Sequence, residues 1–269
     1  MQLGKTRSVM DQPARILVAD DSAVNRKMAS AMLASLGYAV DVVDNGRQAV
    51  AAVSGTSYQA VLMDCQMPEM DGYEAAQEIR RLEPPGRHLR IIAMTATISP
   101  ADRDKALSSG MDDYLPKPLS LESLGVALNE ADLSGEHESL DKALTDRLGD
   151  PKADVIVPGR LAELEKVAGE DGIDGFSVLA RIFLDESASR HAKVLDAIAQ
   201  RDLGEIKRLM HALKGTARNL GANALGDVCE RIEERATDGL ADPSPDLLAA
   251  FESECVRVRT FLRQWIGDD

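Results

Sequence analysis

Short apolar runs alternate with amphipathic stretches along the first half of the chain. The apolar runs predict buried strands over residues 15–19, 38–43, 60–64, 90–94 and 113–115. The amphipathic stretches predict helices over residues 23–36, 46–53, 73–82 and 100–109, and a last one from residue 121. Strict alternation of strands and helices is typical of a doubly wound α/β fold, in which helices cover both faces of a parallel sheet.

The second half of the chain shows no strand pattern. Its apolar spacing predicts helices over residues 161–167, 176–199, 203–220, 224–237 and 246–266. Long helices joined by short loops indicate an antiparallel four-helix bundle. The weakly patterned stretch between the halves predicts a semi-flexible tether, with a possible helical turn or two over 139–148. We therefore expect an α/β domain over 14–130, an acidic linker over 131–157 and an all-α bundle over 158–269.

The acidic composition narrows the classes of partner. The formal net charge is −14, of which residues 1–130 contribute −4 and residues 131–269 contribute −10. Nucleic acid and anionic lipid are unfavourable partners, because affinity for both comes from basic groups. The three cysteines show no metal-ligand spacing. We find no signal peptide and no membrane-spanning segment, so we expect a cytoplasmic protein that does not insert into membranes.

Polar side chains stand where the predicted strands end. Asp20 and Asp21 follow the first strand, Asp64 ends the third, Thr95 the fourth and Lys117 the fifth. In an open parallel sheet, the ligand site lies beyond the carboxyl ends of the strands. Taken alone, Asp64 is equally well explained as a cap of the following turn. The five side chains together instead predict a site at one rim of the sheet.

Three carboxylates at one rim need a counter-charge. A like-charge pair about 4 Å apart costs about 4 kcal/mol at an effective dielectric constant near 20. A divalent cation with a preference for oxygen relieves this repulsion, and Mg²⁺ (or Mn²⁺) suits a site with few carboxylates and a phosphate. Lys117 adds a positive charge with three hydrogen-bond donors, and the Thr95 hydroxyl can bond an incoming phosphoryl group.

The chain over roughly residues 14–130 resembles the receiver domain of two-component response regulators. The segments that carry the resemblance are Val18-Ala19-Asp20-Asp21, Met63-Asp64-Cys65-Gln66-Met67-Pro68, Met94-Thr95-Ala96 and Leu115-Pro116-Lys117-Pro118. The sequence around Asp64 is most similar to that of receivers attached to hybrid histidine kinases. The resemblance implies a flavodoxin-like sheet of five strands and an active receiver rather than a degenerate one.

The resemblance also implies a role for each site residue. Asp64 is expected to be the phosphoacceptor. Asp20, Asp21, Asp64 and the backbone carbonyl of Gln66 are expected to hold the metal. Thr95 and Tyr114 match the pair of switch residues, and the Lys117–Pro118 peptide bond is expected to be cis.

A second chemical signal lies in the helix predicted over residues 203–220. Helical spacing places His211, Lys214, Gly215 and Arg218 on one face, while neighbouring leucines point to the core. A lone helical histidine is usually a surface residue without further role. Gly215 argues otherwise, because glycine inside a helix costs roughly 1 kcal/mol relative to alanine and needs a reason. We expect a partner surface to approach there, with the imidazole standing out from the bundle.

This segment resembles the signature of histidine phosphotransfer (HPt) domains, and the likeness covers about residues 155–269. The resemblance implies that His211 accepts and donates a phosphoryl group through one ring nitrogen, and that Lys214, Gly215 and Arg218 assist docking. The remaining histidines lack this setting. We assign His88, His137 and His191 to solvent.

The leading hypothesis is a phosphorelay protein with an Asp receiver and a His shuttle. No Gly-rich ATP motif appears, so a histidine kinase, another carrier or a small phosphodonor must supply the phosphoryl group. Histidine kinases and other receiver domains are the expected partners, and transfer within the chain stays open. One alternative is the tail of a hybrid histidine kinase, although the initial methionine favours a free-standing chain. Others are a phosphorylation-switched binding module and an aspartyl phosphatase, disfavoured because Gln66 replaces that class's second acid.

Overall fold

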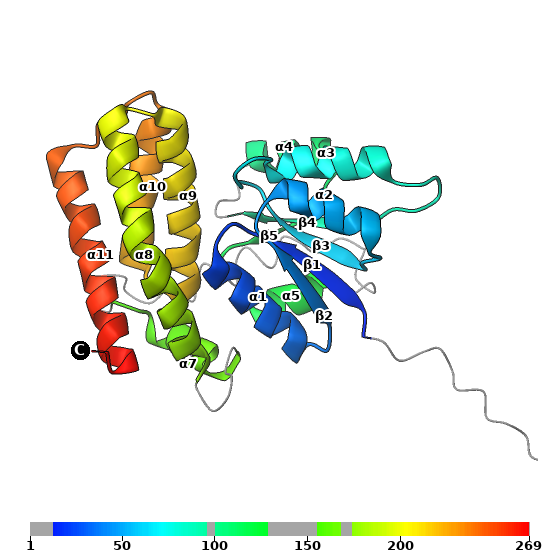
Figure 1. Ribbon diagram of the computed structural model, residues 1–269, viewed down its shortest axis with the longest axis horizontal. Coiled ribbons are helices and arrows are strands. Elements are labelled where there is room, and N and C mark those ends of the chain that lie inside the picture. The colour runs from blue at the N-terminus through cyan, green and yellow to red at the C-terminus, as the bar shows by residue number, and fades with distance from the viewer. Residues whose placement is uncertain (1–12, 96–99, 129–154, 168–173, 269) are drawn as a thin grey trace, which may run out of the picture.

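A computed structural model describes residues 13–95, 100–128, 155–167 and 174–268 of the chain (Figure 1). Its first part contains β1 (Arg15–Ala19), α1 (Ala23–Ser35), β2 (Ala39–Val43), α2 (Gly46–Gly55), β3 (Ala60–Asp64), α3 (Gly72–Leu82), β4 (Arg90–Thr95), α4 (Pro100–Ser108), β5 (Asp113–Pro116) and α5 (Leu121–Leu128). The expected alternation of strands and helices is confirmed, and most boundaries lie within two residues of their predicted positions.

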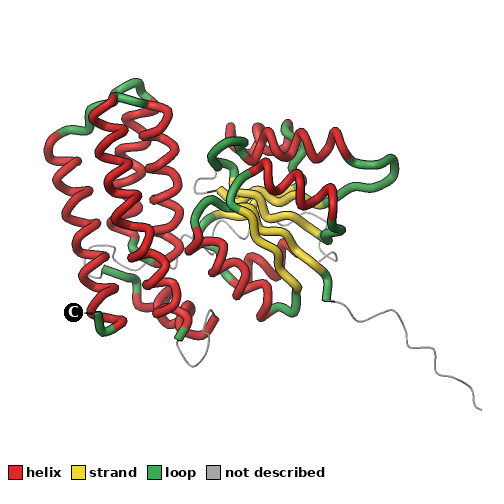
Figure 2. The backbone as a smooth tube through the Cα atoms, in the orientation of Figure 1, coloured by secondary structure: helices red, strands yellow, loops and turns green. Residues whose placement is uncertain are grey.

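The five strands form one parallel sheet in the order β2-β1-β3-β4-β5. Helices α1 and α5 cover one face, and α2, α3 and α4 cover the other, so the molecule has three layers here (Figures 1 and 2). This is the doubly wound fold predicted from the pattern. The reversal of strand order places a crevice beside β1 and β3, where ligands of such sheets bind.

Alternate residues of the central strands enter two separate apolar cores. Ile16, Val18 and Leu62 belong to the cluster that includes Met28 of α1 and Leu124 of α5. Leu17 and Val61 join the core beneath α2 and α3 on the opposite face. Because both faces are buried, the middle of each central strand is apolar, and polar residues occur at the strand ends.

The second part contains α7 (Pro158–Val167), α8 (Gly175–Gln200), α9 (Leu203–Leu220), α10 (Asn223–Thr237) and α11 (Pro245–Ile266). Helices α8 to α11 lie side by side as the predicted bundle, and α7 packs at its foot (Figure 1). Asp174, Asp202 and Ser244 cap the starts of α8, α9 and α11 with side-chain oxygens. Gly221 ends α9 in the left-handed region at φ 87°, as expected of a C-terminal glycine.

One end of the predicted linker belongs to the bundle. Ile156 is buried, and the amide of Val157 donates to the carbonyl oxygen of Gly221 at 3.0 Å. Residues 155–157 therefore pack as part of the second domain, a correction to the predicted linker end at 157. The rest of that linker, including the helical turn expected over 139–148 and His137, lies outside the described residues.

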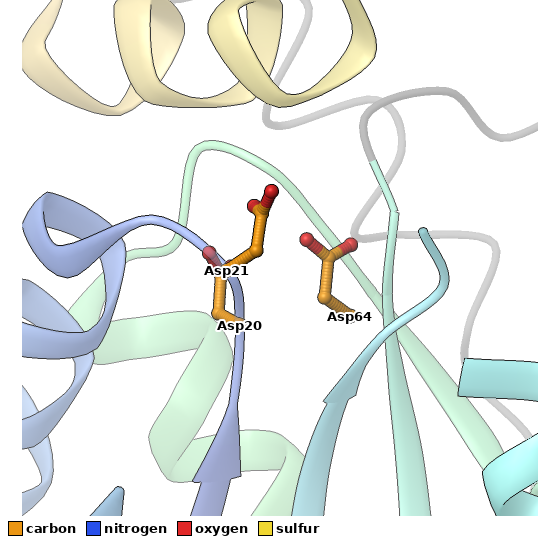
Figure 3. Close-up of side chains that lie close together, drawn as sticks. All are labelled: Asp20, Asp21 and Asp64. Carbon is orange, nitrogen blue, oxygen red and sulfur yellow. The ribbon is translucent and has the colours of Figure 1, made fainter. Parts of the chain in front are cut away.

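The α1 side of the sheet and the bundle share one apolar core. Met28 of α1 belongs to the same cluster of buried side chains as Leu164 of α7 and Leu213 of α9. The two domains therefore contact each other through α1, and the carboxyl rim of the sheet faces α9 (Figures 1 and 3). None of the described helices combines the length and the apolar character needed to cross a membrane.

Candidate functional site

Three carboxylates converge at the carboxyl ends of β1 and β3 (Figure 3). Asp20, Asp21 and Asp64 each offer an oxygen within 4.8 Å of the others. Asp20 and Asp64 are buried, whereas Asp21 is half-buried and points towards the bundle. The structure thus brings together the acidic residues that the strand ends predicted.

Lys117 provides the counter-charge inside this cluster. Its Nζ lies 2.9 Å from Asp20 Oδ2 and 2.8 Å from Asp64 Oδ2, and all three side chains are buried. Burial acts to lower the pKa of Lys117, but the two carboxylates outweigh it and hold the pKa above its ordinary value. Lys117 is followed by a cis bond to Pro118, as the resemblance implied.

The charged forms of the carboxylates remain disfavoured by burial and mutual repulsion despite the positive charge of Lys117. Burial raises the pKa of Asp64, and the neighbouring Asp20 adds to the effect while Lys117 opposes it. Burial and Asp20 likewise raise the pKa of Asp21. The Oδ1 atom of Asp21 is buried and has no hydrogen-bond partner. A group of hard oxygen donors with one free lone-pair atom fits a divalent cation such as Mg²⁺.

Local backbone contacts hold the acids in place. The Ser22 amide donates to Asp20 Oδ1 at 2.9 Å. The side-chain amide of Asn25 donates to both Asp20 oxygens, at 3.0 and 3.2 Å. Gly72 lies so close behind the strand that a Cβ there would be 2.1 Å from the Asp64 carbonyl oxygen. Asn25 and Gly72 were not predicted as site residues, although both lie in polar or turn-rich segments next to the motifs.

The two expected switch residues lie together beside the acids. Thr95 and Tyr114 line one small pocket with Cys65 and Tyr73. The guanidinium carbon of Arg103 lies 5.6 Å from the centroid of the Tyr114 ring. The Gln66 amide nitrogen lies 3.5 Å from Asp64 Oδ1, which places this residue at the rim. The metal-binding role of its carbonyl oxygen stays a prediction.

His211 lies at the domain contact and is not exposed as expected. Its exposed fraction is 6%, because Glu233 lies on one side of the ring and the receiver rim covers α9. The expectation of an imidazole standing out from the bundle is therefore wrong for this arrangement of the domains. The predicted face of α9 meets the other domain at Gly215, whereas Lys214 and Arg218 pair with carboxylates of α10.

Hydrogen bonding distinguishes the two ring nitrogens of His211. Nδ1 lies 2.9 Å from Glu233 Oε1, whereas Nε2 is buried without a hydrogen-bond partner. Lys214 Nζ lies 2.7 Å from Glu233 Oε2, so the carboxylate connects the two residues. Burial acts to raise the pKa of Glu233, but His211 and Lys214 outweigh it and hold the pKa below its ordinary value.

The remaining face residues divide between the domain contact and the bundle. A Cβ on Gly215 would lie 3.4 Å from Lys117 Cδ, which is an ordinary van der Waals distance, so Gly215 lies directly against the other domain. Arg218 instead pairs with Asp227 and Glu230 of α10, and its role in docking stays a prediction. Sequence reasoning missed Glu233, because nothing in its local pattern marks it as a partner of His211.

His211 and the two residues that follow Asp64 in sequence line a shared cleft of about 490 Å³. The receiver contributes Cys65, Gln66 and Thr95, and the bundle contributes His211 and Lys214. The charge of His211 also acts on Asp64 and opposes the rise in its pKa. Of the two predicted phosphoryl carriers, His211 lines this cleft itself, and Asp64 immediately precedes the lining residues Cys65 and Gln66.

The other histidines differ in their surroundings. His88 is exposed and lies against Asp112, in agreement with its assignment to solvent. His191 does not fit that assignment. Its ring centroid lies 5.6 Å from that of Phe251, and its buried Nε2 has no hydrogen-bond partner. Its position on α8 turns it towards α11, a packing that its local sequence did not reveal.

Comparisons with known proteins agree with this division. Residues 16–129 match the model of the response regulator receiver domain, and residues 178–261 match that of the Hpt domain. The chain therefore carries a receiver domain followed by an Hpt domain, the domain types of two-component phosphorelay signalling.

Several relatives are much longer sensor proteins. The chain is 31% identical over 229 residues to the sensor protein GacS of Pseudomonas syringae pv. syringae, covering 81% of this chain and 24% of that protein. It is 30% identical over 244 residues to the signal transduction histidine-protein kinase BarA of Shigella flexneri, covering 88% and 26%. The chain thus spans about a quarter of the length of these two relatives.

One similar solved structure is the receiver domain of a sensor histidine kinase from Pseudomonas aeruginosa PAO1, with a magnesium ion coordinated in its active-site cleft. The match has 44% sequence identity, covers 44% of this chain and 95% of that one, and has a TM-score of 0.41.

Proposed function

We propose that this chain is a phosphorelay protein in which Asp64 and His211 carry a phosphoryl group in turn. The observation that supports this most strongly is their placement. The receiver rim and the His211 face of α9 line one cleft, and Gly215 lies against Lys117. Two unrelated acceptors on separate domains have no structural need to meet in this way.

The acid cluster is suited to accept a phosphoryl group. A carboxylate oxygen of Asp64 attacks phosphorus in line with the leaving oxygen, and the Lys117 ammonium lies where it neutralises phosphoryl oxygens. Asp20, Asp21 and Asp64, with the Gln66 carbonyl, would hold Mg²⁺ (or Mn²⁺). When bound, that ion supplies further positive charge to the phosphoryl oxygens. Thr95 and Tyr114, which line one pocket, would act as switch residues that change conformation when Asp64 is phosphorylated.

His211 is arranged to react through Nε2. With the Nδ1 proton donated to Glu233, the lone pair of Nε2 is directed away from that carboxylate. The Nε2–P bond forms as the P–O bond to Asp64 breaks, and the Asp64 carboxylate leaves with the bonding pair. No proton has to move in this step. The positive charge that arises on the phosphorylated ring is balanced by Glu233, and the reverse reaction uses the same groups.

The partners follow from the same chemistry. Because the sequence holds no ATP-binding motif, we propose that a histidine kinase or another phosphorylated carrier supplies the phosphoryl group, and that receiver domains accept it from His211. The chain then acts as a phosphorelay intermediate and not as a kinase.

Labelled acetyl phosphate with Mg²⁺ tests the proposal. We expect label on both acceptors of the natural chain, on Asp64 alone in His211→Gln, and on neither in Asp64→Ala. Acyl phosphate and phosphohistidine are separated by alkali, which removes only the former. His88→Gln is a control, because this exposed histidine lies away from both sites. Label that persists at His211 in Asp64→Ala would show direct charging and contradict relay from Asp64.

A further inference from the structure

Asn219 of α9 joins the bundle to two parts of the receiver. Its Nδ2 donates to Asn25 Oδ1 at 2.8 Å, and its Oδ1 accepts from the Leu119 amide at 3.2 Å. Asn219 is fully buried and Asn25 nearly so. Both halves of the Asn219 amide are therefore used on the other domain, one on α1 and one on the segment that follows Lys117 and Pro118.

The same contact continues into the acid cluster. Asn25 accepts from Asn219 with its oxygen and donates to Asp20 with its nitrogen. An unbroken series of hydrogen bonds thus runs from the bundle through two amides to a carboxylate of the phosphorylation site. We call Asn219, Asn25 and the Leu119 amide the docking latch.

Further polar contacts surround the docking latch. Thr216 Oγ1 lies 2.9 Å from Ser22 Oγ, between α9 and the start of α1. Arg160 of α7 donates to the Asn219 carbonyl oxygen at 2.8 Å and reaches Met28 Sδ at 3.1 Å. The Thr216–Ser22 and Arg160–Met28 contacts join residues of different domains, more than a hundred positions apart, so they exist only while the domains are docked.

Opposite charges face each other at the edge of the contact. A cleft of about 310 Å³ is lined by Asp21, Asp44 and Glu69 of the receiver and by Arg190, Lys193 and Arg208 of the bundle. Arg208 Nη1 lies 3.6 Å from Asp21 Oδ2. Such complementarity steers the two surfaces together and sets their register.

We propose that the docking latch holds the two domains as a closed relay unit, which exchanges phosphoryl groups internally and excludes outside partners from both sites. The inference rests on the proposed function, since it concerns the route between Asp64 and His211. Exclusion follows from burial, because Asp64 is 1% exposed and His211 6% exposed in the docked arrangement. An outside kinase or receiver reaches these residues only after the latch opens.

Two labelling reactions separate internal from external exchange. In the first, the natural chain is labelled at Asp64 with acetyl phosphate, and the appearance of label on His211 is followed at several dilutions. In the second, labelled His211→Gln chain is mixed with Asp64→Ala chain, so that label can move only between copies. We expect the internal rate to be independent of concentration. At about 10 μM chain, exchange between copies should be roughly 100-fold slower, because tethered partners have effective concentrations in the millimolar range.

Variants of the latch should change the two rates in opposite directions. Asn219→Ala should slow internal exchange about tenfold, consistent with the loss of hydrogen bonds that hold the domains in register. When both copies carry Asn219→Ala, exchange between them should become faster, because each site is then uncovered. Thr216→Val, which keeps the side-chain shape, should act in the same directions with a smaller effect.

Thr237→Val is the matched control for Thr216→Val. Both threonines bond a carbonyl oxygen one turn back, Thr216 that of Ala212 and Thr237 that of Glu233, but Thr216 also meets Ser22. We expect Thr237→Val to leave the ratio of the two rates unchanged. If Asn219→Ala fails to fold, Thr216→Val and the dilution series still decide the matter.

Three results would overturn the inference. They are an internal rate that falls on dilution, exchange between the His211→Gln and Asp64→Ala chains as fast as exchange within the natural chain, and latch variants that slow both reactions alike. Absence of label on His211 in every reaction, including the mixed one, would instead contradict the proposed function itself.

Discussion

The two proposed phosphoryl sites are built in different ways, although both lie where the carboxyl rim of the sheet contacts α9. The acid site of the receiver is made from strand ends, which parallel pairing forces into proximity. The site around His211 lies in the middle of a regular helix, and its surroundings come from α10 and from the other domain. A site made from strand ends can be predicted from the sequence, whereas a site completed by another helix and another domain cannot.

The difference also appears in the charges. Asp64 lies among carboxylates that share one lysine, Lys117, so negative charge is in excess at this site. A divalent cation would balance that excess. His211 lies against one carboxylate that also holds Lys214. The net negative charge of the receiver site therefore attracts cations, whereas the charges of Glu233 and Lys214 beside His211 already balance each other. The predictions below test this contrast.

The largest effect is expected from loss of the lysine. Lys117→Ala leaves Asp20 and Asp64 buried without their cation and removes the donor to phosphoryl oxygens. We expect the rate of labelling at Asp64 by acetyl phosphate to fall by about 100-fold, the usual cost of removing one such donor. Lys105→Ala, an exposed lysine of the same domain, should stay within about twofold of the natural rate. Equal rates for the two variants would contradict the role of Lys117.

A smaller effect is expected at the histidine. Glu233→Gln keeps the shape of the side chain but removes the charge that holds Nδ1. A charge-assisted hydrogen bond is worth about 1.5–3 kcal/mol, so transfer to His211 should slow by roughly 10- to 100-fold while labelling of Asp64 stays unchanged. Glu234→Gln alters the exposed neighbouring residue and should leave the rates of both steps unchanged. Single-turnover labelling measures both steps, and unaltered transfer in Glu233→Gln would show that the carboxylate has no part in it.

Two glycines beside the sites should respond with opposite signs. In Gly72→Ala the added Cβ would meet the Asp64 carbonyl oxygen, so the free energy of unfolding should fall by about 1–3 kcal/mol. In Gly215→Ala the nearest atoms are those of the flexible Lys117 side chain. There the better helix propensity of alanine should raise the stability of the bundle by up to about 1 kcal/mol. Urea unfolding of both variants provides the comparison, and a stable Gly72→Ala chain would refute the close approach.

The smallest effect concerns pH. The pKa of Glu233 is lower in the folded chain than its ordinary value of 4.5, so the unfolded chain binds the proton more readily. Its contribution to stability is present above that value and is lost as the pH falls through the folded-state pKa. The difference in unfolding free energy between the natural chain and Glu233→Gln should therefore shrink as the pH falls below the ordinary pKa of 4.5 and through the folded-state pKa. Urea unfolding of both chains across this pH range measures the difference in unfolding free energy. A difference that does not change with pH would show that His211 and Lys214 do not hold the carboxylate.

Much of the fold follows from local pattern. Apolar runs ending in Asp20, Asp64 and Thr95 predicted strands that are buried on both faces, and the helices predicted over 23–36 and 203–220 begin and end within one residue of those bounds. The acid cluster followed in turn, because parallel strands bring their carboxyl ends to one rim.

The features that depend on distant packing were not predictable. Glu233 meets His211 because of how α10 crosses α9, and no spacing within either helix encodes that meeting. The burial of His211 and the pairing of Asn219 with Asn25 need the receiver in place, as does the contact of Gly215 with Lys117. A helical pattern identifies a face, but the surface that covers it lies in another part of the chain.

The most direct test of the central claim is a chase of label within one preparation. The natural chain is charged at Asp64 with acetyl phosphate, the donor is removed, and alkali-labile and alkali-stable label are followed with time. The account predicts that label leaves Asp64 with the same rate constant as it appears on His211. Loss of label from Asp64 entirely as inorganic phosphate, with none on His211, would contradict it.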